Sequence, residues 1–196
     1  MARVYLEGGG DSKELHSRCR EGFRKLLERT GFGGRMPRLV ACGGRGAAFD
    51  DFRTAIRTAR DEFVALLVDS EEPVLDGEQP WAHLHSRDAW ARPEGVSEDQ
   101  ALLMITSMET WIASDPAAIR GRFGTHVRLN ALPDVQGIEG RSRAFVLAAL
   151  KSATQPCPAV YSKGAMSFQV LAPLSPNALM ALPSFARLRR ILDARL

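Results

Sequence analysis

The 196-residue sequence has only three cysteines, few lysines and no long apolar segment. Cys19, Cys42 and Cys157 are far apart and form no CxxC pair, which argues against a disulfide framework and against a zinc site. No apolar run approaches the ~18–20 residues that span a membrane. Strand-like sequence begins almost at the first residue, so we expect no secretory leader. Together these absences favour a cytoplasmic protein with reduced thiols and no membrane partner.

Several common enzyme signatures are also missing. The sequence contains no GxxxxGK[ST] phosphate loop, no GxGxxG dinucleotide motif and no HExxH zinc motif. The glycine-rich segment 43–46 can bind an anion through its backbone N–H groups, or it can be a plain tight turn. Any ATP-driven step therefore requires a partner chain.

The charge balance is mildly basic, with a formal net charge of +3. Nearly all of the positive charge is arginine, because lysine occurs only at positions 13, 25, 151 and 163. A basic excess suits an anionic partner, although a GC-rich genome gives the same composition. The candidates for contact with phosphate are Arg45, Arg120, Arg122, Arg141 and Arg143.

The apolar periodicity predicts an α/β fold in which strands and helices alternate. Strands joined by helical crossovers are parallel, so we expect a Rossmann-like, mainly parallel sheet flanked by helices. Residues 101–106 form either a fourth strand or the start of a helix. The alternating segments are three strands, 3–6, 38–42 and 63–68, and two helices, 11–30 and 47–60.

The second half of the sequence is mostly helical. Prolines and turn clusters in residues 72–99 predict a long excursion with little regular structure, and residues 124–141 predict a second one. We expect a single domain, 1–196, in which 1–115 holds the core of the site and 116–196 forms a helical extension. The later helices are expected at 107–113, from Asp115-Pro116 onward, and at 142–153, 166–172 and 183–195.

Acidic residues follow the first and third predicted strands. Glu7 ends the first and is separated from Asp11 by three glycines, whereas Asp69 and Glu71 follow the third. Parallel strands end at one edge of a sheet, where ligands bind, and residues two apart on an extended end face the same side. Clustered carboxylates repel unless a cation lies between them, and Mg²⁺ and Mn²⁺ prefer oxygen ligands. The sequence therefore predicts a metal–carboxylate site.

Other interpretations of these acids remain open. Asp11 or Ser12 can be the N-cap of the first helix, and Glu7 can be a solvated strand end. Asp69 and Glu71 can form the polar start of a loop.

Two further charged residues have the same ambiguity. Glu109 is either on a helix surface or partly sheltered beside Trp111. Lys163 lies in a predicted loop, where it is either solvated or placed to stabilise charge on a phosphate.

The motifs together resemble the Toprim (topoisomerase–primase) domain. Glu7-Gly-Gly-Gly-Asp11 and Asp69-Ser-Glu71 match its early glutamate and its later DxD-type acidic pair, which bind Mg²⁺ during phosphodiester chemistry. The whole chain is similar to a bacterial Toprim-like family of unassigned function, the domain of unknown function 4276. The segments that carry this similarity are 4–12, 42–52, 66–71, 108–111 and 161–164.

A more distant resemblance is to Toprim nucleases of the overcoming-lysogenisation-defect type. Asp11, Glu109 and Lys163 match, by order and type, their second acidic residue, their later glutamate and their late lysine. Glu71 departs from the pattern, because it replaces the second aspartate of DxD and its longer side chain changes the reach. The resemblance implies that Glu7, Asp69, Glu71 and Lys163 are catalytic and that Glu7, Asp11, Asp69, Glu71 and Glu109 bind metal.

The resemblance implies a Mg²⁺- or Mn²⁺-dependent nuclease that acts on DNA or RNA. Proteins of this kind are often encoded beside ABC-type ATPases, so an ATPase partner and a role in defence against phage or other foreign DNA are expected. A homo-oligomer is also compatible with the sequence. One alternative is a non-enzymatic binding or regulatory subunit with a degenerate site, which the departure at Glu71 favours. Another is a small-nucleotide phosphotransferase on the same scaffold.

Overall fold

Four parallel strands form the centre of the protein. The computed structural model describes residues 2–59 and 62–196. The strand order is β2-β1-β3-β4, and each neighbouring pair is parallel, which confirms the Rossmann-like α/β fold expected from the sequence. The segment 101–106, for which strand and helix were both open, contains a strand. The strands are β1 (Ala2–Leu6), β2 (Arg38–Ala41), β3 (Phe63–Asp69) and β4 (Ala101–Met104).

Most of the predicted helices are present, with ends that shift by a few residues. The first begins at Lys13 because the Ser12 side chain accepts a hydrogen bond from the N–H of Leu15, so Ser12 is the N-cap. The helices are α1 (Lys13–Leu27), α2 (Arg45–Thr58), α3 (Pro80–Asp88), α4 (Met108–Ala113), α5 (Pro116–Phe123), α6 (Arg143–Thr154), α7 (Ala165–Leu171), α8 (Pro176–Met180) and α9 (Pro183–Arg195).

Two of these helices differ from the sequence prediction. α3 lies inside residues 72–99, which were expected to have little regular structure, and α8 was not predicted. α3 buries only Pro80, Trp81 and Leu84, and α8 buries only Leu179, so each has too few buried positions for its helical period to be recognised in the sequence. Among the described residues, none of the helices has the length and apolar content to cross a membrane.

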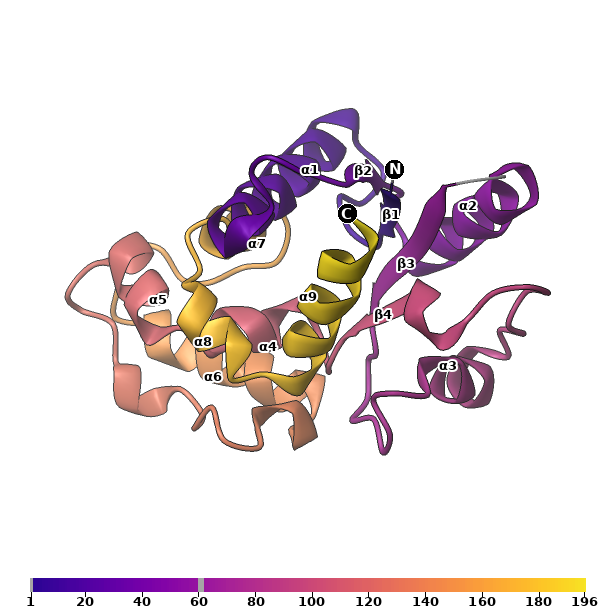
Figure 1. Cartoon of the computed structure of the whole chain (residues 1–196). Coiled ribbons are helices and arrows are strands. Elements are labelled where there is room, and N and C mark those ends of the chain that lie inside the picture. The colour runs from indigo at the N-terminus through magenta and orange to yellow at the C-terminus, as the bar shows by residue number, and fades with distance from the viewer. Residues whose placement is uncertain (1, 60–61) are drawn as a thin grey trace.

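Helices cover both faces of the sheet (Figure 1). α2 and α3 cover one face, where Trp81 packs in the same core as Leu66 of β3. α1, α4 and α9 cover the other face, where Phe23 and Phe185 share a larger core with Leu67. Neighbouring residues of β3 thus point into different cores, which is why the whole strand is apolar rather than alternating.

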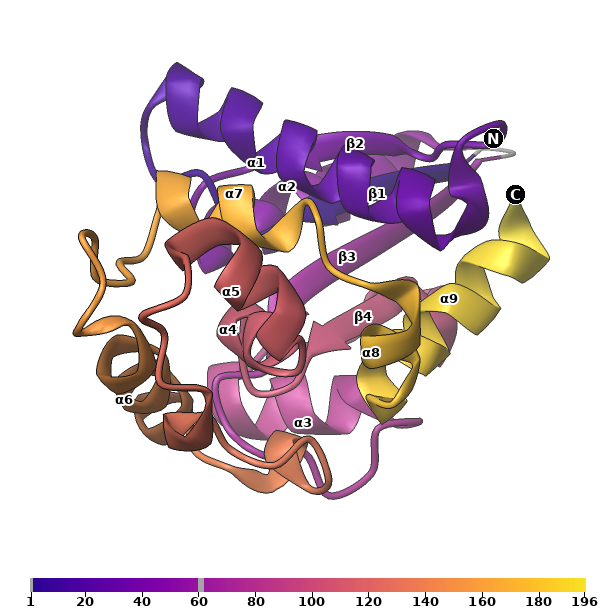
Figure 2. The same cartoon turned by 90° about the vertical axis from the view of Figure 1, so that its left-hand side faces the viewer.

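The helices after α5 return to the sheet instead of forming a separate body. α7 packs along α1 and α9 packs along β4, as Figures 1 and 2 show from two directions. The loop between α6 and α7 therefore runs close to the edge at which β1 and β3 end. Residues from the last quarter of the chain, Tyr161 and Lys163 among them, reach the predicted site by this route.

Candidate metal centre at the carboxyl edge of the sheet

Three carboxylates converge where β1 and β3 end. One carboxylate oxygen from each of Glu7, Asp69 and Glu71 lies within 4.8 Å of the others. β1 and β3 are adjacent and parallel, with Leu6 beside Leu67, so the residues that follow both strands leave the sheet at the same edge. The convergence predicted from the sequence is confirmed. Oxygen donors at this spacing can hold a hard divalent cation such as Mg²⁺ or Mn²⁺.

Glu7 is fixed by backbone contacts on both sides. Its N–H donates to the carbonyl of Leu67 (2.9 Å), and Gly8 exchanges two backbone hydrogen bonds with Gly43 (2.8 and 3.0 Å). Gly43 has φ 81°, and a Cβ added there would lie 2.4 Å from the carbonyl oxygen of Gly10. Only glycine permits this approach. The loops that follow β1 and β2 are therefore locked together beside Glu7.

Asp69 is the buried member of the cluster, with 7% of its surface exposed. Its N–H donates to Glu7 Oε2 (3.1 Å), and its Oδ1 accepts from the N–H of Met108 (2.8 Å). Burial, followed by the nearby carboxylates of Glu7 and Glu109, raises the pKa of Asp69 to about 8. The Met108 N–H and Arg143 lower it by less. Asp69 is therefore largely protonated at neutral pH until a cation binds.

Glu71 has a backbone conformation that the sequence did not predict, and this conformation places its side chain in the cluster. β3 ends at Asp69, and Glu71 is left-handed, with φ 68°, rather than extended. This conformation costs roughly 1–2 kcal/mol for a residue with a Cβ. A hydrogen bond from its N–H to the Thr106 carbonyl (2.8 Å) and an ion pair with Arg143 hold it in place. The predicted strand-like alternation is wrong here, although the side chain does meet Asp69.

Glu109 is a further buried carboxylate close to Asp69. Its side chain is 3% exposed and is paired with Lys163 Nζ at 3.2 Å. The Tyr161 hydroxyl donates to Glu109 Oε1 (3.1 Å) and lies 2.8 Å from Ser167 Oγ. Burial and the charge of Glu109 raise the pKa of Tyr161 above its usual range. Glu109 is thus sheltered, as one of the two sequence interpretations held, and Lys163 is held beside it rather than only solvated.

Replacing Tyr161 with phenylalanine should lower the free energy of unfolding by about 1–3 kcal/mol, because Glu109 and Ser167 lose a buried partner. Tyr5→Phe is the matched control, since within the described part of the chain the Tyr5 hydroxyl accepts a single long bond, from Arg3 (3.3 Å). We expect it to cost less than about 1 kcal/mol. Chemical denaturation of both variants measures the difference. Equal losses would show that Tyr161 does not support Glu109.

Asp11 lies outside the three-carboxylate cluster. It is exposed in the turn before α1, and the N-cap role belongs to Ser12. The glycines at positions 8, 9 and 10 all have positive φ, and Asp11 follows the turn that they form. The structure therefore brings Glu7, Asp69 and Glu71 together, places Glu109 and Lys163 next to them, and leaves Asp11 at the surface.

Arg45, which the sequence offers as a candidate phosphate contact, is also in direct contact with the carboxylate cluster, and this contact was not predicted. Its Nη1 donates to the Asp69 carbonyl and lies 3.4 Å from Glu7 Oε2. Its Nε and Nη2 bind Asp88 at 3.1 and 2.6 Å, and its Cζ lies 4.8 Å from the centre of the Trp90 ring. The available signal was its position directly after β2. Because β2 pairs with β1, the glycine-rich turn had to lie at the same edge as Glu7.

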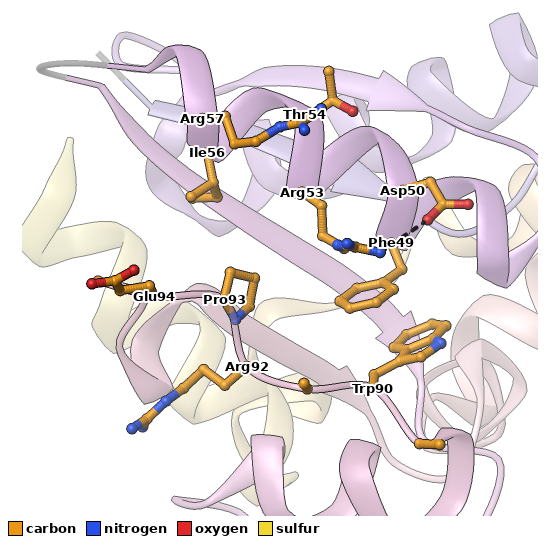
Figure 3. Close-up of a pocket in the computed structure, with 13 residues that line it drawn as sticks. Phe49, Asp50, Arg53, Thr54, Ile56, Arg57, Trp90, Arg92, Pro93 and Glu94 are labelled. Atoms are coloured by element: carbon orange, nitrogen blue, oxygen red, sulfur yellow. Dashed lines mark ion pairs between the residues drawn. The ribbon is translucent and has the colours of Figure 1, made fainter.

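A groove of about 1050 Å³ lies between α2 and the segment 89–95 (Figure 3). Phe49 and Trp90 stack in its wall, with ring centres 4.2 Å apart and planes 7° apart. Arg53 points toward Phe49 (Figure 3), and its Cζ lies 5.4 Å from the ring centre. Trp90 also contacts Arg45, whose Nη1 reaches Glu7, so this groove adjoins the carboxylate cluster.

Comparisons with known proteins give a family but not a function. No curated protein and no solved structure matches the sequence. A family model, described as a domain of unknown function (DUF4276), matches residues 6–193, which include β2 to β4 and every candidate site residue. The chain therefore belongs to the DUF4276 family.

Proposed function

We propose that this protein is a divalent-metal-dependent nuclease that hydrolyses phosphodiester bonds in DNA or RNA. The observation that carries the proposal is the convergence of Glu7, Asp69 and Glu71 within 4.8 Å at the carboxyl edge of a parallel sheet. The proposal includes the Toprim relationship that the same motifs suggest. It also includes a cytoplasmic location and the ATPase partner in antiviral defence, for which the sequence resemblance is the support.

The surroundings of the cluster fit a cation. Asp69 is buried next to two other carboxylates, and its raised pKa of about 8 reports how unfavourable its ionised form is without a positive charge. Ser107, which directly precedes α4, has a buried hydroxyl oxygen with no hydrogen-bond partner among the described residues. The N–H of the next residue, Met108, already binds Asp69, so this hydroxyl lies at the α4 end that faces the cluster.

In this proposal Glu7, Asp69 and Glu71 hold one or two Mg²⁺ or Mn²⁺ ions. Such ions, when bound, lower the pKa of water and stabilise the leaving oxygen of a phosphodiester. Lys163, held by Glu109 and 37% exposed, supplies a positive charge for the phosphate. Glu109 is close enough to act on Asp69 electrostatically and contributes to the negative field of the site. The exposed Asp11 is a weaker candidate for a second ion.

The groove beside the cluster supports a polymeric substrate. Its walls carry Arg53, Arg57 and Arg92, and contacts between arginines and phosphates supply much of the affinity of proteins for nucleic acids. Trp90 and Arg45 join it to the carboxylates. A mononucleotide would not need this second surface, so the groove favours the nuclease over the phosphotransferase.

One observation favours the rival proposal of a non-catalytic regulatory subunit. Glu7 and Glu71 are already paired with Arg45 and Arg143, respectively. Internal cations of this kind could replace a metal permanently in a degenerate site. Glu71 is also the position that departs from the DxD pattern.

Titration of the purified chain with MnCl₂ separates the two proposals. A nuclease should show saturable Mn²⁺ binding by calorimetry, and Asp69→Asn should abolish it. Glu72→Gln is the matched control, because Glu72 is an exposed acidic residue in the same segment, 69–72, and lies outside the cluster. Wild-type protein that binds no Mn²⁺ would favour the regulatory subunit.

A further inference from the structure

Each outer carboxylate of the cluster is paired with an arginine from a different part of the chain. Arg45 follows β2 and contacts Glu7, and Arg143 begins α6 and contacts Glu71. We propose that these arginines form a phosphate-binding pair, and that Arg143 leaves Glu71 for a phosphate of the nucleic-acid substrate when a divalent cation enters the cluster. This inference rests on the proposed function and assigns the residues that couple metal binding to substrate binding.

Arg45 is the fixed member of the pair. Its side chain is 14% exposed, and two of its three nitrogens bind the two oxygens of Asp88. Trp90 lies against its guanidinium plane, and Phe49 stacks on Trp90. Only Nη1 faces the cluster, where it contacts Glu7 and the Asp69 carbonyl. Both N–H bonds of Nη1 are thus engaged, and the one directed at Glu7 becomes available to a phosphate when Glu7 binds the cation instead.

Arg143 is the movable member. Its side chain is 35% exposed, and within residues 2–59 and 62–196 its only ion pair is with Glu71. Its backbone is fixed, because Ser142 caps α6 and the Thr106 hydroxyl donates to the Arg141 carbonyl (3.2 Å). The side chain can thus turn away from Glu71 while its Cα stays at the edge of the cluster.

The exchange of partners by Arg143, from Glu71 to a phosphate, follows from the charges. A Glu71 oxygen that binds a divalent cation loses much of its attraction for Arg143, and the cation itself repels the guanidinium. The displaced guanidinium, which is already 35% exposed, is then able to pair with another anion that has two oxygens. A phosphodiester supplies them in the geometry that an arginine fork matches, and its phosphate oxygens also bind the metal. A phosphate is therefore the group that satisfies the cation and Arg143 together.

The first measurement is Mn²⁺ affinity without nucleic acid. Arg143→Gln should bind Mn²⁺ roughly threefold to tenfold more tightly than wild type, because the cation no longer competes with an ion pair. Arg143→Lys keeps the charge and should change the affinity less. Arg141→Gln removes the same charge two residues earlier, from a side chain that lies over Phe145, and controls for long-range electrostatics. We expect less than about a twofold change for that variant.

The second measurement is the affinity for a fluorescent single-stranded oligonucleotide in Ca²⁺. Arg143→Gln should bind it about tenfold more weakly, and the slope of log affinity against log salt should fall by about 0.7. Arg143→Lys should recover the slope but not the full affinity, because a lysine lacks the two-pronged donor. A purely structural role of Arg143 would leave the salt slope unchanged.

The outcomes separate this inference from the proposed function. If wild-type protein binds Mn²⁺ but Arg143→Gln and Arg141→Gln have equal metal affinity, the exchange is wrong and the metal site stands. If Arg143→Gln binds the oligonucleotide as well as wild type does, the phosphate assignment is wrong. If wild-type protein binds no Mn²⁺, the proposed function and this inference both fail.

Discussion

Replacing Asp69 with asparagine should lower Mn²⁺-dependent cleavage of DNA or RNA by a factor on the order of 10³. Asparagine has the same shape, and its side-chain oxygen can still accept the hydrogen bond from Met108 (2.8 Å in the wild type). What it removes is the charge at the centre of three converging carboxylates. Loss of activity would therefore report the loss of a metal ligand and not the collapse of the loop.

The control for this experiment is Glu72→Gln, which removes an exposed charge of the same acidic run. It should cleave within about twofold of wild type, since surface charges act weakly over this distance in salt. Initial cleavage rates on single- and double-stranded substrates, with Mn²⁺ and with Mg²⁺, give the comparison. Asp69→Asn protein that cleaves at the wild-type rate would refute the catalytic assignment.

The positions of Glu7 and Asp69 were predictable from sequence because they depend on local rules. Each follows an apolar strand, and the helical crossovers between those strands force them to be parallel. Parallel strands end at the same edge, so the two carboxylates had to meet. No knowledge of side-chain packing was needed for this step.

The neighbours of the cluster were less predictable because they depend on long-range packing. Arg45 and Asp88 are 43 positions apart, and Tyr161 and Glu109 are 52 apart. No sequence pattern predicts either pair. The docking of α3 brings Asp88 to Arg45, and the docking of the loop before α7 brings Tyr161 to Glu109. The left-handed backbone of Glu71 was also hidden, because glycine or asparagine is the usual residue in that conformation.

The stability of the metal-free protein should fall as the pH rises from about 4 to about 8. Asp69 has a pKa raised from 3.8 to about 8 in the folded protein, mainly by burial and then by Glu7 and Glu109. The folded state therefore holds a proton that the unfolded chain releases near pH 4. This contribution is fully present below the unfolded pKa and is lost as the pH rises through the folded one.

Asp69→Asn isolates this effect, because it removes the titrating group and keeps the acceptor for Met108. In EDTA, the free energy of unfolding of the variant relative to wild type should rise by roughly 3–5 kcal/mol between pH 4 and pH 8. Denaturation curves at several pH values measure this difference. Glu72→Gln should show no such trend, since Glu72 is exposed.

Added Mn²⁺ should reverse the loss in wild-type protein at pH 8, because a cation between the carboxylates stabilises the ionised form of Asp69. Saturation at about a hundred times the dissociation constant would contribute about 2.7 kcal/mol. The same addition should leave Asp69→Asn unchanged. The contrary result is a difference in unfolding free energy between wild type and Asp69→Asn that is the same at pH 5 and pH 8 in EDTA. It would show that Asp69 is ionised without a metal, and that Arg45 and Arg143 alone neutralise the carboxylates.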